Sequence, residues 1–231
     1  MKIACKLGAK FGLFTCENEE AFLVKQRFNE HIASYGLSYG TQEEYDFRMN
    51  QYMIKEADIA EINANPAHTF TVGHNQFSTW TDSEYRKLLG WRDLGLERDE
   101  VLLDEASAAA SVDWRTKGAV TGVKDQGQCG SCWAFSTTGA IEGADFLEGN
   151  GELQSFSEQQ LVDCDHFVNR GCNGGSMDAA FVWAKTNPLM LESAYPYTSG
   201  TTKKDGECAY QRSEGKSKVS GWVKVKAGSA A

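Results

Sequence analysis

The 231-residue sequence has no apolar run long enough to cross a membrane, and it carries little basic charge. A membrane-spanning helix needs about 18 or more consecutive apolar residues, and no run in this chain approaches that length. The 23 Lys and Arg residues are outnumbered by 32 Asp and Glu residues, which gives a net charge of −9. Binding to nucleic acid or to an anionic membrane surface needs a basic patch. We therefore expect neither kind of partner.

Cysteine is absent from the long stretch between Cys16 and Cys129. The first half of the chain therefore does not depend on crosslinks for its fold. An odd number of cysteines in an oxidising compartment leaves one thiol unpaired. The second half is thus expected to combine crosslinks with a free thiol, among five cysteines: Cys129, Cys132, Cys164, Cys172 and Cys208.

Composition changes along the chain divide it into four segments. Residues 1–18 begin with a basic residue near Met1, but Lys6 and Lys10 interrupt the apolar character, so they indicate a degenerate or trimmed signal peptide. Residues 19–93 contain helical patterns. Residues 94–109 are charged and then rich in alanine and serine, which is typical of a linker. Residues 110–231 form the second folded domain and contain most of the glycine-rich turns.

The strongest helical pattern covers residues 43–63 and is preceded by a helix predicted over 19–31. Six residues of the longer helix lie on one face, because they are spaced by four, four, three, four and four positions. This face mixes charged, aromatic, aliphatic and amide side chains, which favours a helix that packs across another. Alternation predicts a strand within 68–77, and a capped helix is predicted over 81–89. The six residues are Glu44, Arg48, Tyr52, Lys55, Ile59 and Asn63.

In the second half, the pattern predicts helices over 131–147, 157–163 and 176–185, and a strand over 219–226. In the first of these helices an apolar or small residue recurs every fourth position. The two glycines in that row would allow another backbone to approach closely, so we expect the helix to be central and buried. The row consists of Phe135, Gly139, Gly143 and Leu147.

The sequence GQCGSCWAF, residues 127–135, places Cys132 at the start of the predicted helix. Unpaired amide groups and the positive end of the helix dipole stabilise a thiolate at such a position. Gln126 precedes Cys132 by six residues, in a glycine-flanked loop. Its side-chain amide is suited to donating a hydrogen bond to an oxyanion. The position thus suits a reactive thiol, while a redox couple and half of a metal site remain open as interpretations of Cys129 and Cys132.

This stretch, with the DQG before it, resembles the papain-like cysteine peptidases. The resemblance continues in SVDWR at Ser111, LVDC at Leu161, GCNGG at Gly171 and YPY at Tyr195. It implies an α+β, papain-like fold with a mainly helical lobe and a β-rich lobe, a nucleophile at Cys132 and an oxyanion donor at Gln126. It also implies disulfides Cys129–Cys172 and Cys164–Cys208, substrate main-chain binding by Gly174 and Gly175, and an apolar pocket bordered by Ser176 and Met177.

The first half resembles the inhibitory prosegment of the cathepsin L-like branch of that family. The six-residue face of the long helix matches its first motif, with Tyr52 where Phe is usual and Lys55 where Asn is usual. Gly73, Asn75 and Phe77 match its second motif, but Thr79 stands where Asp is usual. Losing that Asp is expected to weaken the support of the prosegment. The resemblance makes 19–93 a helical prosegment that occupies the cleft, 94–109 the cleavage region and 110–231 the peptidase domain.

The partner His and Asn of a papain-type Cys follow it by about 130–150 residues, and only 99 residues follow Cys132. The four histidines are His31, His68, His74 and His166. We therefore expect the β-rich lobe to be largely missing and the peptidase domain to be incomplete at its C-terminus. We also expect an exposed apolar face on the helical lobe and little or no activity of this chain, because no imidazole would protonate the leaving amine.

The predicted function is that of a cysteine endopeptidase precursor, inhibited by its own prosegment. It would act on protein or peptide substrates as a monomer, without a cofactor or metal, in a lysosome, a vacuole or outside the cell. One alternative is a non-catalytic inhibitor of related peptidases. Two remote ones are a thiol–disulfide oxidoreductase using Cys129 and Cys132, and a zinc site that also includes Cys164 and Cys172, whose spacing fits no common zinc pattern. A Cys129–Cys132 bond would favour redox chemistry, and a Cys129–Cys172 bond a peptidase.

Overall fold

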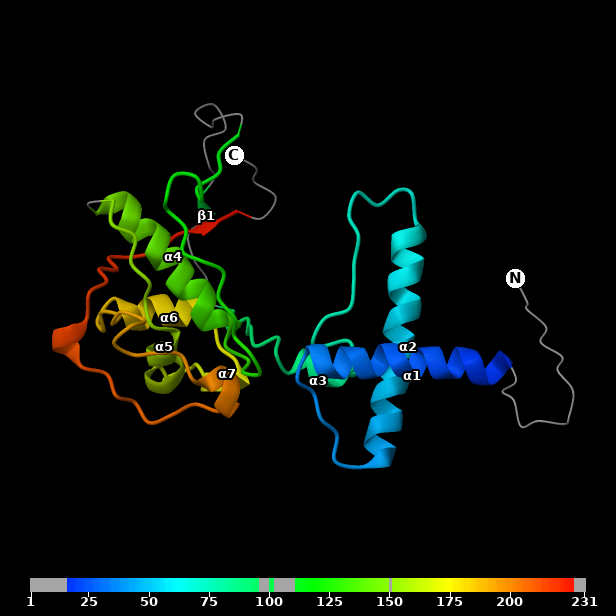
Figure 1. Ribbon diagram of the computed structural model, residues 1–231. Helices are drawn as coiled ribbons and strands as arrows, with labels where there is room; N and C mark the ends of the chain where they lie inside the picture. Colours follow the sequence, from blue (N-terminus) through cyan, green and yellow to red (C-terminus); the bar gives the residue numbers. More distant parts are fainter. Residues whose placement is uncertain (1–15, 96–99, 102–110, 150, 227–231) are drawn as a thin grey trace, which may run out of the picture. The chain divides into compact units, whose positions relative to one another are not determined.

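The computed structural model describes residues 16–95, 100–101, 111–149 and 151–226. The chain divides into two compact units, Met1–Tyr85 and Arg86–Ala231, which are described separately (Figure 1). The predicted N-terminal segment lies almost wholly outside the described residues, and so does most of the predicted linker 94–109.

The first unit consists of two long helices that cross each other, followed by a short one (Figure 1). They are α1 (Cys16–Ser34), α2 (Gln42–Ala64) and α3 (Asp82–Arg86). Thr41 caps α2 by accepting a hydrogen bond from the backbone N–H of Glu44 at 3.2 Å, which satisfies one of the free amides of the first turn. The helices predicted over 19–31 and 43–63 are present, and each is longer than predicted.

The small core of the first unit is aromatic. Phe28 of α1 is fully buried, and its ring packs against the rings of Tyr39, Tyr45 and Tyr52, with centroids 5.1–6.2 Å away. Aromatic rings contribute large apolar areas per residue, so a few of them can hold two crossing helices together. The prediction that α2 packs across another helix is confirmed.

The predicted strand within 68–77 is wrong, because these residues form turns and extended chain without a strand partner. Side-chain amides, rather than a neighbouring strand, form hydrogen bonds with the backbone of this stretch. Asn63 donates to the carbonyl of Val72 and accepts from its N–H, both at 2.8 Å. Asn75 accepts from the N–H of Phe77 at 2.9 Å. The helix predicted over 81–89 is shorter, 82–86, and begins with a reciprocal capping box between Thr81 and Glu84.

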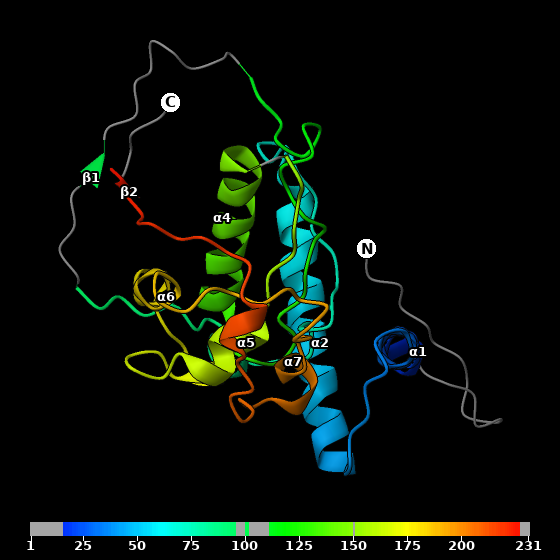
Figure 2. The same ribbon diagram turned by 90° about the vertical axis from the view of Figure 1, so that its left-hand side faces the viewer.

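The second unit is built around α4 (Cys132–Glu148), against which α5 (Glu158–Cys164) and α6 (Met177–Ala184) both pack (Figure 2). Short elements complete it: β1 (Glu100–Val101), η2 (Gly171–Asn173), α7 (Ser199–Thr202), η3 (Arg212–Glu214) and β2 (Lys224–Val225). β1 and β2 pair in parallel. The core between the helices includes the fully buried Trp133, Phe156, Leu161 and Leu189.

The face of α4 that is buried differs from the predicted one. Trp133, Thr137 and Ile141 point into the core, whereas Leu147 is 57% exposed and a Cβ on Gly139 would meet no atom within 4 Å. The expectation that this helix is central and buried is confirmed, because α5 and α6 both pack against it, but the glycine row is not its buried face. A row of small residues permits a close backbone approach but does not require one. The predicted strand 219–226 is limited to Lys224–Val225.

Candidate active site

Cys132 is the first residue of α4 and the only unpaired cysteine among the described residues whose side chains are placed. It is partly exposed. The helix continues for 17 residues, so the first-turn amides and the helix dipole favour negative charge at this end. The preceding Ser131 does not cap the helix with its side chain. Its hydroxyl instead lies 2.7 Å from the hydroxyl of Tyr197, and this contact holds the residue just before Cys132 in place.

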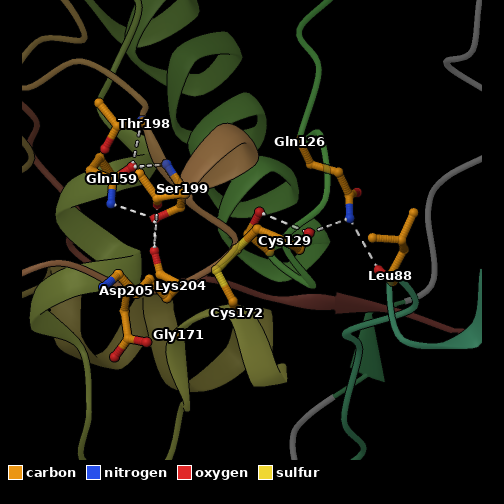
Figure 3. Close-up of a disulfide and its surroundings, with 12 residues drawn as sticks. Leu88, Gln126, Cys129, Gln159, Gly171, Cys172, Thr198, Ser199, Lys204 and Asp205 are labelled. Atoms are coloured by element: carbon orange, nitrogen blue, oxygen red, sulfur yellow. Dashed lines mark hydrogen bonds between the residues drawn. A yellow bond between two sulfur atoms is a disulfide. The ribbon is translucent and has the colours of Figure 1, made fainter. Parts of the chain in front are cut away.

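Two disulfides hold the loops around this helix end. Cys129 is bonded to Cys172, which ties the loop before α4 to η2 (Figure 3). Cys164 at the end of α5 is bonded to Cys208. These are the pairs that the family resemblance implies. They leave Cys132 reduced while its neighbour three residues earlier is crosslinked, so a Cys129–Cys132 redox couple does not exist in this structure.

No described group of three or more His, Cys, Asp or Glu side chains is arranged to hold a metal ion. The zinc alternative also fails on the chemistry of its ligands. Cys129, Cys164 and Cys172 are oxidised in disulfides, and a zinc ligand must be a thiolate. Within the described part of the chain, no helix has the length and apolarity needed to span a bilayer.

Gln126 is held with its side-chain amide directed at two carbonyl groups (Figure 3). Its Nε2 donates to the carbonyl of Leu88 at 3.0 Å and to that of Cys129 at 2.8 Å. Its own backbone carbonyl accepts a hydrogen bond from the hydroxyl of Tyr197 at 2.9 Å. The chain turns sharply after it, with Gly127 at φ +57°. The amide that is suited to an oxyanion is therefore engaged with a carbonyl of residue 88.

A buried charge network anchors the extended stretch that leads to Gln126. Lys124 Nζ lies 2.7 Å from Glu142 Oε1 on α4 and 2.6 Å from Glu158 Oε1 on α5. Both carboxylates are almost completely buried, so their charges depend on this lysine and on hydroxyl donors for compensation. Lys124 thus fixes the chain two residues before Gln126 to both helices.

Residues Leu88–Arg92, here called the closing segment, run along the backbone of Gly174 and Gly175. The N–H of Gly175 donates to the carbonyl of Gly90 at 2.7 Å, and the N–H of Arg92 donates to the carbonyl of Gly175 at 2.8 Å. This is a parallel bridge centred on Trp91. Both main-chain groups of Gly175 are therefore occupied by the chain's own backbone.

Two polar residues that the sequence patterns did not identify position the glycine loop. Asn169 accepts a hydrogen bond from the N–H of Ser176 at 2.8 Å and donates to Asp165 at 2.6 Å. Burial raises the pKa of Asp165 to about 6. Both residues stand in an ordinary-looking loop, and no spacing or motif marks them. Ser176 is buried just before α6, and Met177 begins that helix and packs against the core.

Arg48, in the six-residue motif on α2, connects this helix to the start of α3. Its guanidinium forms two hydrogen bonds of 2.7 Å to the carboxylate of Glu84 and a third, of 3.1 Å, to the carbonyl of Thr79. These bonds hold the pKa of Glu84 down at about 2. Glu44, one turn earlier on α2, lies 3.7 Å from the Arg48 guanidinium and is a secondary partner. Thr79, where Asp is usual, is buried and accepts a hydrogen bond from Tyr39 at 3.1 Å.

The other residues of the two prosegment motifs have distinct roles. Tyr52 is buried and stacks on His74 with ring centroids 4.1 Å apart. Asn63 holds Val72, as described above, and Phe77 packs edge-on against Trp80 and Tyr85. Lys55 forms a surface pair with Asp58 at 3.1 Å. Gly73 is exposed, and a Cβ there would meet no atom within 4 Å.

None of the four histidines is assigned to the chemistry of Cys132 by this geometry. His31, His68 and His74 belong to the first unit. His166 lies on the loop after α5, where its Nε2 is 3.7 Å from Asp205. The side chain is 44% exposed, which is typical of a solvated loop histidine.

Residues 108–231 match the family described as papain family cysteine protease, and residues 28–85 match the cathepsin propeptide inhibitor domain (I29). The chain belongs to the papain family of cysteine proteases. Its α+β architecture, with a mainly helical lobe and a helical prosegment, is the papain-like precursor fold. The family resemblance carried by the residue motifs is thereby confirmed.

Individual papain-family members cover most of the chain. It is 39% identical over 210 residues to digestive cysteine proteinase 1 of Homarus americanus, covering 87% of this chain and 64% of that protein. It is 39% identical to procathepsin L of Rattus norvegicus, with 81% and 57% covered. The structure of digestive procathepsin L 3 from the Tenebrio molitor larval midgut matches with a TM-score of 0.74 and 36% identity, covering 85% and 64%. The chain thus spans less than two thirds of each of these relatives.

Proposed function

We propose that this chain is a cysteine endopeptidase precursor in which Cys132 is the nucleophile and the closing segment blocks the site. One observation carries the proposal: Gln126 and Gly175 both bond to the closing segment of the same chain, next to a helix that begins at an unpaired cysteine. A substrate backbone would need the same two partners. The site is thus built for a peptide chain and is filled by one.

In the proposed reaction the Cys132 thiolate attacks the carbonyl carbon of a peptide bond. The carbonyl oxygen becomes an oxyanion, and Gln126 Nε2 and a backbone N–H at the start of α4 are placed to donate to it. Breakdown of this adduct releases the amine, which needs a proton, and leaves a thioester that water hydrolyses. Gly174 and Gly175 would bind the substrate main chain. Ser176 and Met177 would border a pocket for an apolar side chain two residues before the scissile bond.

Among the described residues, no histidine is assigned as the donor of the proton that the leaving amine needs. We therefore expect the polypeptide of these residues to cleave a fluorogenic peptide slowly even when the closing segment is removed. Robust turnover that is lost in Cys132→Ser would contradict this expectation. Proteins and peptides are the proposed substrates, without a cofactor, and a monomer suffices. The two disulfides favour an oxidising compartment, so a lysosomal, vacuolar or secreted location is proposed.

The proposed nucleophile can be tested without turnover. The rate of Cys132 alkylation by iodoacetamide is measured at pH 7, with the labelled residue identified by mass spectrometry. The first-turn amides of α4 favour a thiolate, so Cys132 should react faster in the folded chain than in the same chain in denaturant. A folded-state rate at or below the denatured one would overturn the assignment.

The second candidate function, inhibition of a related peptidase, has one supporting observation. The first unit folds around its own aromatic core and matches the cathepsin propeptide inhibitor domain. Adding the full chain, with Cys132→Ser, to an active papain-family enzyme would test it. Inhibition at sub-stoichiometric to equimolar ratios favours this function, and no inhibition at high excess removes it.

A further inference from the structure

The closing segment approaches the lobe most closely at Gly90. A Cβ built on Gly90 would overlap the carbonyl oxygen of Gly130, and it would lie 2.5 Å from the carbonyl carbon and 3.1 Å from the Cα of the same residue. Real Cβ atoms are essentially never found nearer than about 3 Å to another heavy atom. The obstacle is backbone, so no side-chain rotation can relieve it.

The lobe side of this contact also consists of glycine. A Cβ on Gly130 would lie 2.5 Å from the carbonyl oxygen of Cys172 and 2.9 Å from that of Lys87. A Cβ on Gly174 would lie 2.5 Å from the carbonyl oxygen of Gly90. Three backbones therefore meet without intervening side chains.

The lobe cannot readily yield at this point. Gly130 follows Cys129, which is bonded to Cys172, and the N–H of Gly130 donates to the Cys172 carbonyl at 3.0 Å. The crosslink and the hydrogen bond join the two loops that face Gly90. A side chain at position 90 would therefore displace the closing segment and leave the lobe in place.

We propose that Gly90 is the positioning residue of the closing segment, and that its lack of a side chain is what seats Leu88 on Gln126 and residues 90–92 on Gly175. The inference rests on the proposed function only in that the segment is taken to block the site. The contact itself sets the register, because the two hydrogen bonds with Gly175 can form only while Gly90 lies flat against Gly130. Any L-residue at position 90 would break both at once.

The test is hydrogen–deuterium exchange of the full chain carrying Gly90→Ala, read in peptides that contain Arg92 and Gly175. Their amides are hydrogen-bonded across the contact, so we expect exchange there to accelerate by about tenfold or more relative to the unsubstituted chain. The matched control is Gly40→Ala. A methyl group on Gly40 would meet no atom within 4 Å, and the φ of Gly40 is not strained, so exchange at Arg92 and Gly175 should be unchanged.

A general loss of structure would be visible in the same data. Peptides from α4 and α5 report the lobe core, and these should keep their slow exchange in Gly90→Ala. If they do not, Arg92→Pro provides the second arm, because it removes the N–H that donates to Gly175 and leaves Gly90 unchanged. Faster exchange at Gly175 in both variants supports the proposal.

If Gly90→Ala keeps its core intact and exchange at Gly175 is unchanged, the proposal is overturned. If Gly90→Ala unfolds, unchanged exchange at Gly175 in Arg92→Pro overturns it instead. Exchange of amide protons does not depend on thiol chemistry. The proposed function can therefore fail, through slow alkylation of Cys132 in the folded chain, while Gly90 is shown to position the segment. Conversely, Cys132 can prove to be the reactive thiol while exchange at Gly175 shows that Gly90 does not position the segment.

Discussion

The side-chain amide of Gln126 donates a hydrogen bond of 3.0 Å to the carbonyl oxygen of Leu88. The two residues are 38 positions apart in the chain, and the bond joins the loop before α4 to the closing segment. A second bond from the same nitrogen reaches the carbonyl of Cys129 at 2.8 Å. Gln126 thus donates to two carbonyl groups, and a side chain that can only accept hydrogen bonds could not replace it.

Replacing Gln126 should loosen the closing segment. Gln126→Ala removes the bond to Leu88, and each such bond contributes about 0.5–1.5 kcal/mol. Gln126→Glu should loosen it more, because a carboxylate would face two carbonyl oxygens. Limited proteolysis around Leu88 measures the effect. We expect cleavage to be fastest in Gln126→Glu, slower in Gln126→Ala and slowest in the wild type. Gln128→Ala is the control, since the Gln128 side chain forms no part of the contact with Leu88. Equal cleavage of all four chains would contradict the assignment.

Arg48→Ala should destabilise the first unit by about 1–3 kcal/mol, because it leaves Glu84 and the Thr79 carbonyl without their charged donor. The Arg48 side chain is only 16% exposed, so water replaces the lost bonds poorly. Arg48→Lys should recover only part of the loss, since one ammonium cannot make the bidentate contact. Denaturant unfolding followed by exchange in α1 and α2 measures it.

The control for Arg48 is Lys55→Ala, which breaks an exposed ion pair with Asp58 and should cost less than about 1 kcal/mol. If both alanine variants have the same stability, the contact between Arg48 and Glu84 does not hold the first unit together.

The first unit should lose stability as the pH falls below about 6.5, the ordinary histidine value. Burial lowers the pKa of His31, with a further contribution from His74, and burial also lowers the pKa of His74. The Nε2 of His31 and both ring nitrogens of His74 lack hydrogen-bond partners among the described residues. A lowered folded-state pKa means that the neutral form is stabilised, so protonation at acid pH opposes folding.

The surroundings of the His31 and His74 rings include the paired Arg27 and Glu56, whose charges act on His74 in opposite directions. Exchange in α1 and α2 at pH 7 and pH 5, corrected for intrinsic rates, should show the loss. His74→Phe should reduce the dependence, and His68→Gln, at an exposed histidine, should not. A first unit equally stable at both pH values would refute this prediction.

The second unit should respond to pH in the opposite direction. Burial, with the nearby Glu158 carboxylate adding to it, raises the pKa of Glu192 to about 7. A carboxyl whose folded-state pKa is raised favours folding when protonated, and that contribution is lost as the pH rises through about 7. Glu192→Gln keeps an acceptor for the N–H of Tyr197 and cannot ionise.

We therefore expect thermal unfolding of the second unit to shift downward between pH 5 and pH 8, and the shift to be smaller in Glu192→Gln. Glu152→Gln, at an exposed position, is the matched control and should behave as the wild type. An identical shift in all three chains would show that Glu192 does not titrate in this range.

Residue patterns predicted most helices, the capped start of the helix after Thr81 and the helix start at Cys132. These features depend on local chemistry, such as the side-chain oxygen that Thr81 offers to the N–H of Glu84. The patterns failed where a partner decides the outcome. The alternation in 68–77 has no neighbouring strand, and Gly139 of the α4 glycine row has no neighbouring backbone among the described residues.

The site divides in the same way. Cys132 and Gln126 stand in a distinctive sequence, whereas Asn169 and Asp165 hold the glycine loop through contacts that only the folded chain creates. The sequence patterns did not identify the contacts of Leu88 and Gly90, for a similar reason. Their carbonyl groups make the contacts, and every residue has a carbonyl group.

The boundary between the two units follows Tyr85, so the closing segment belongs to the peptidase side of that boundary. Cutting the chain at the boundary would detach the first unit and leave the closing segment hydrogen-bonded to Gln126 and Gly175. Under the proposed function, such a cut alone would not open the site, and a second event would have to trim the chain beyond Arg92 or release the closing segment.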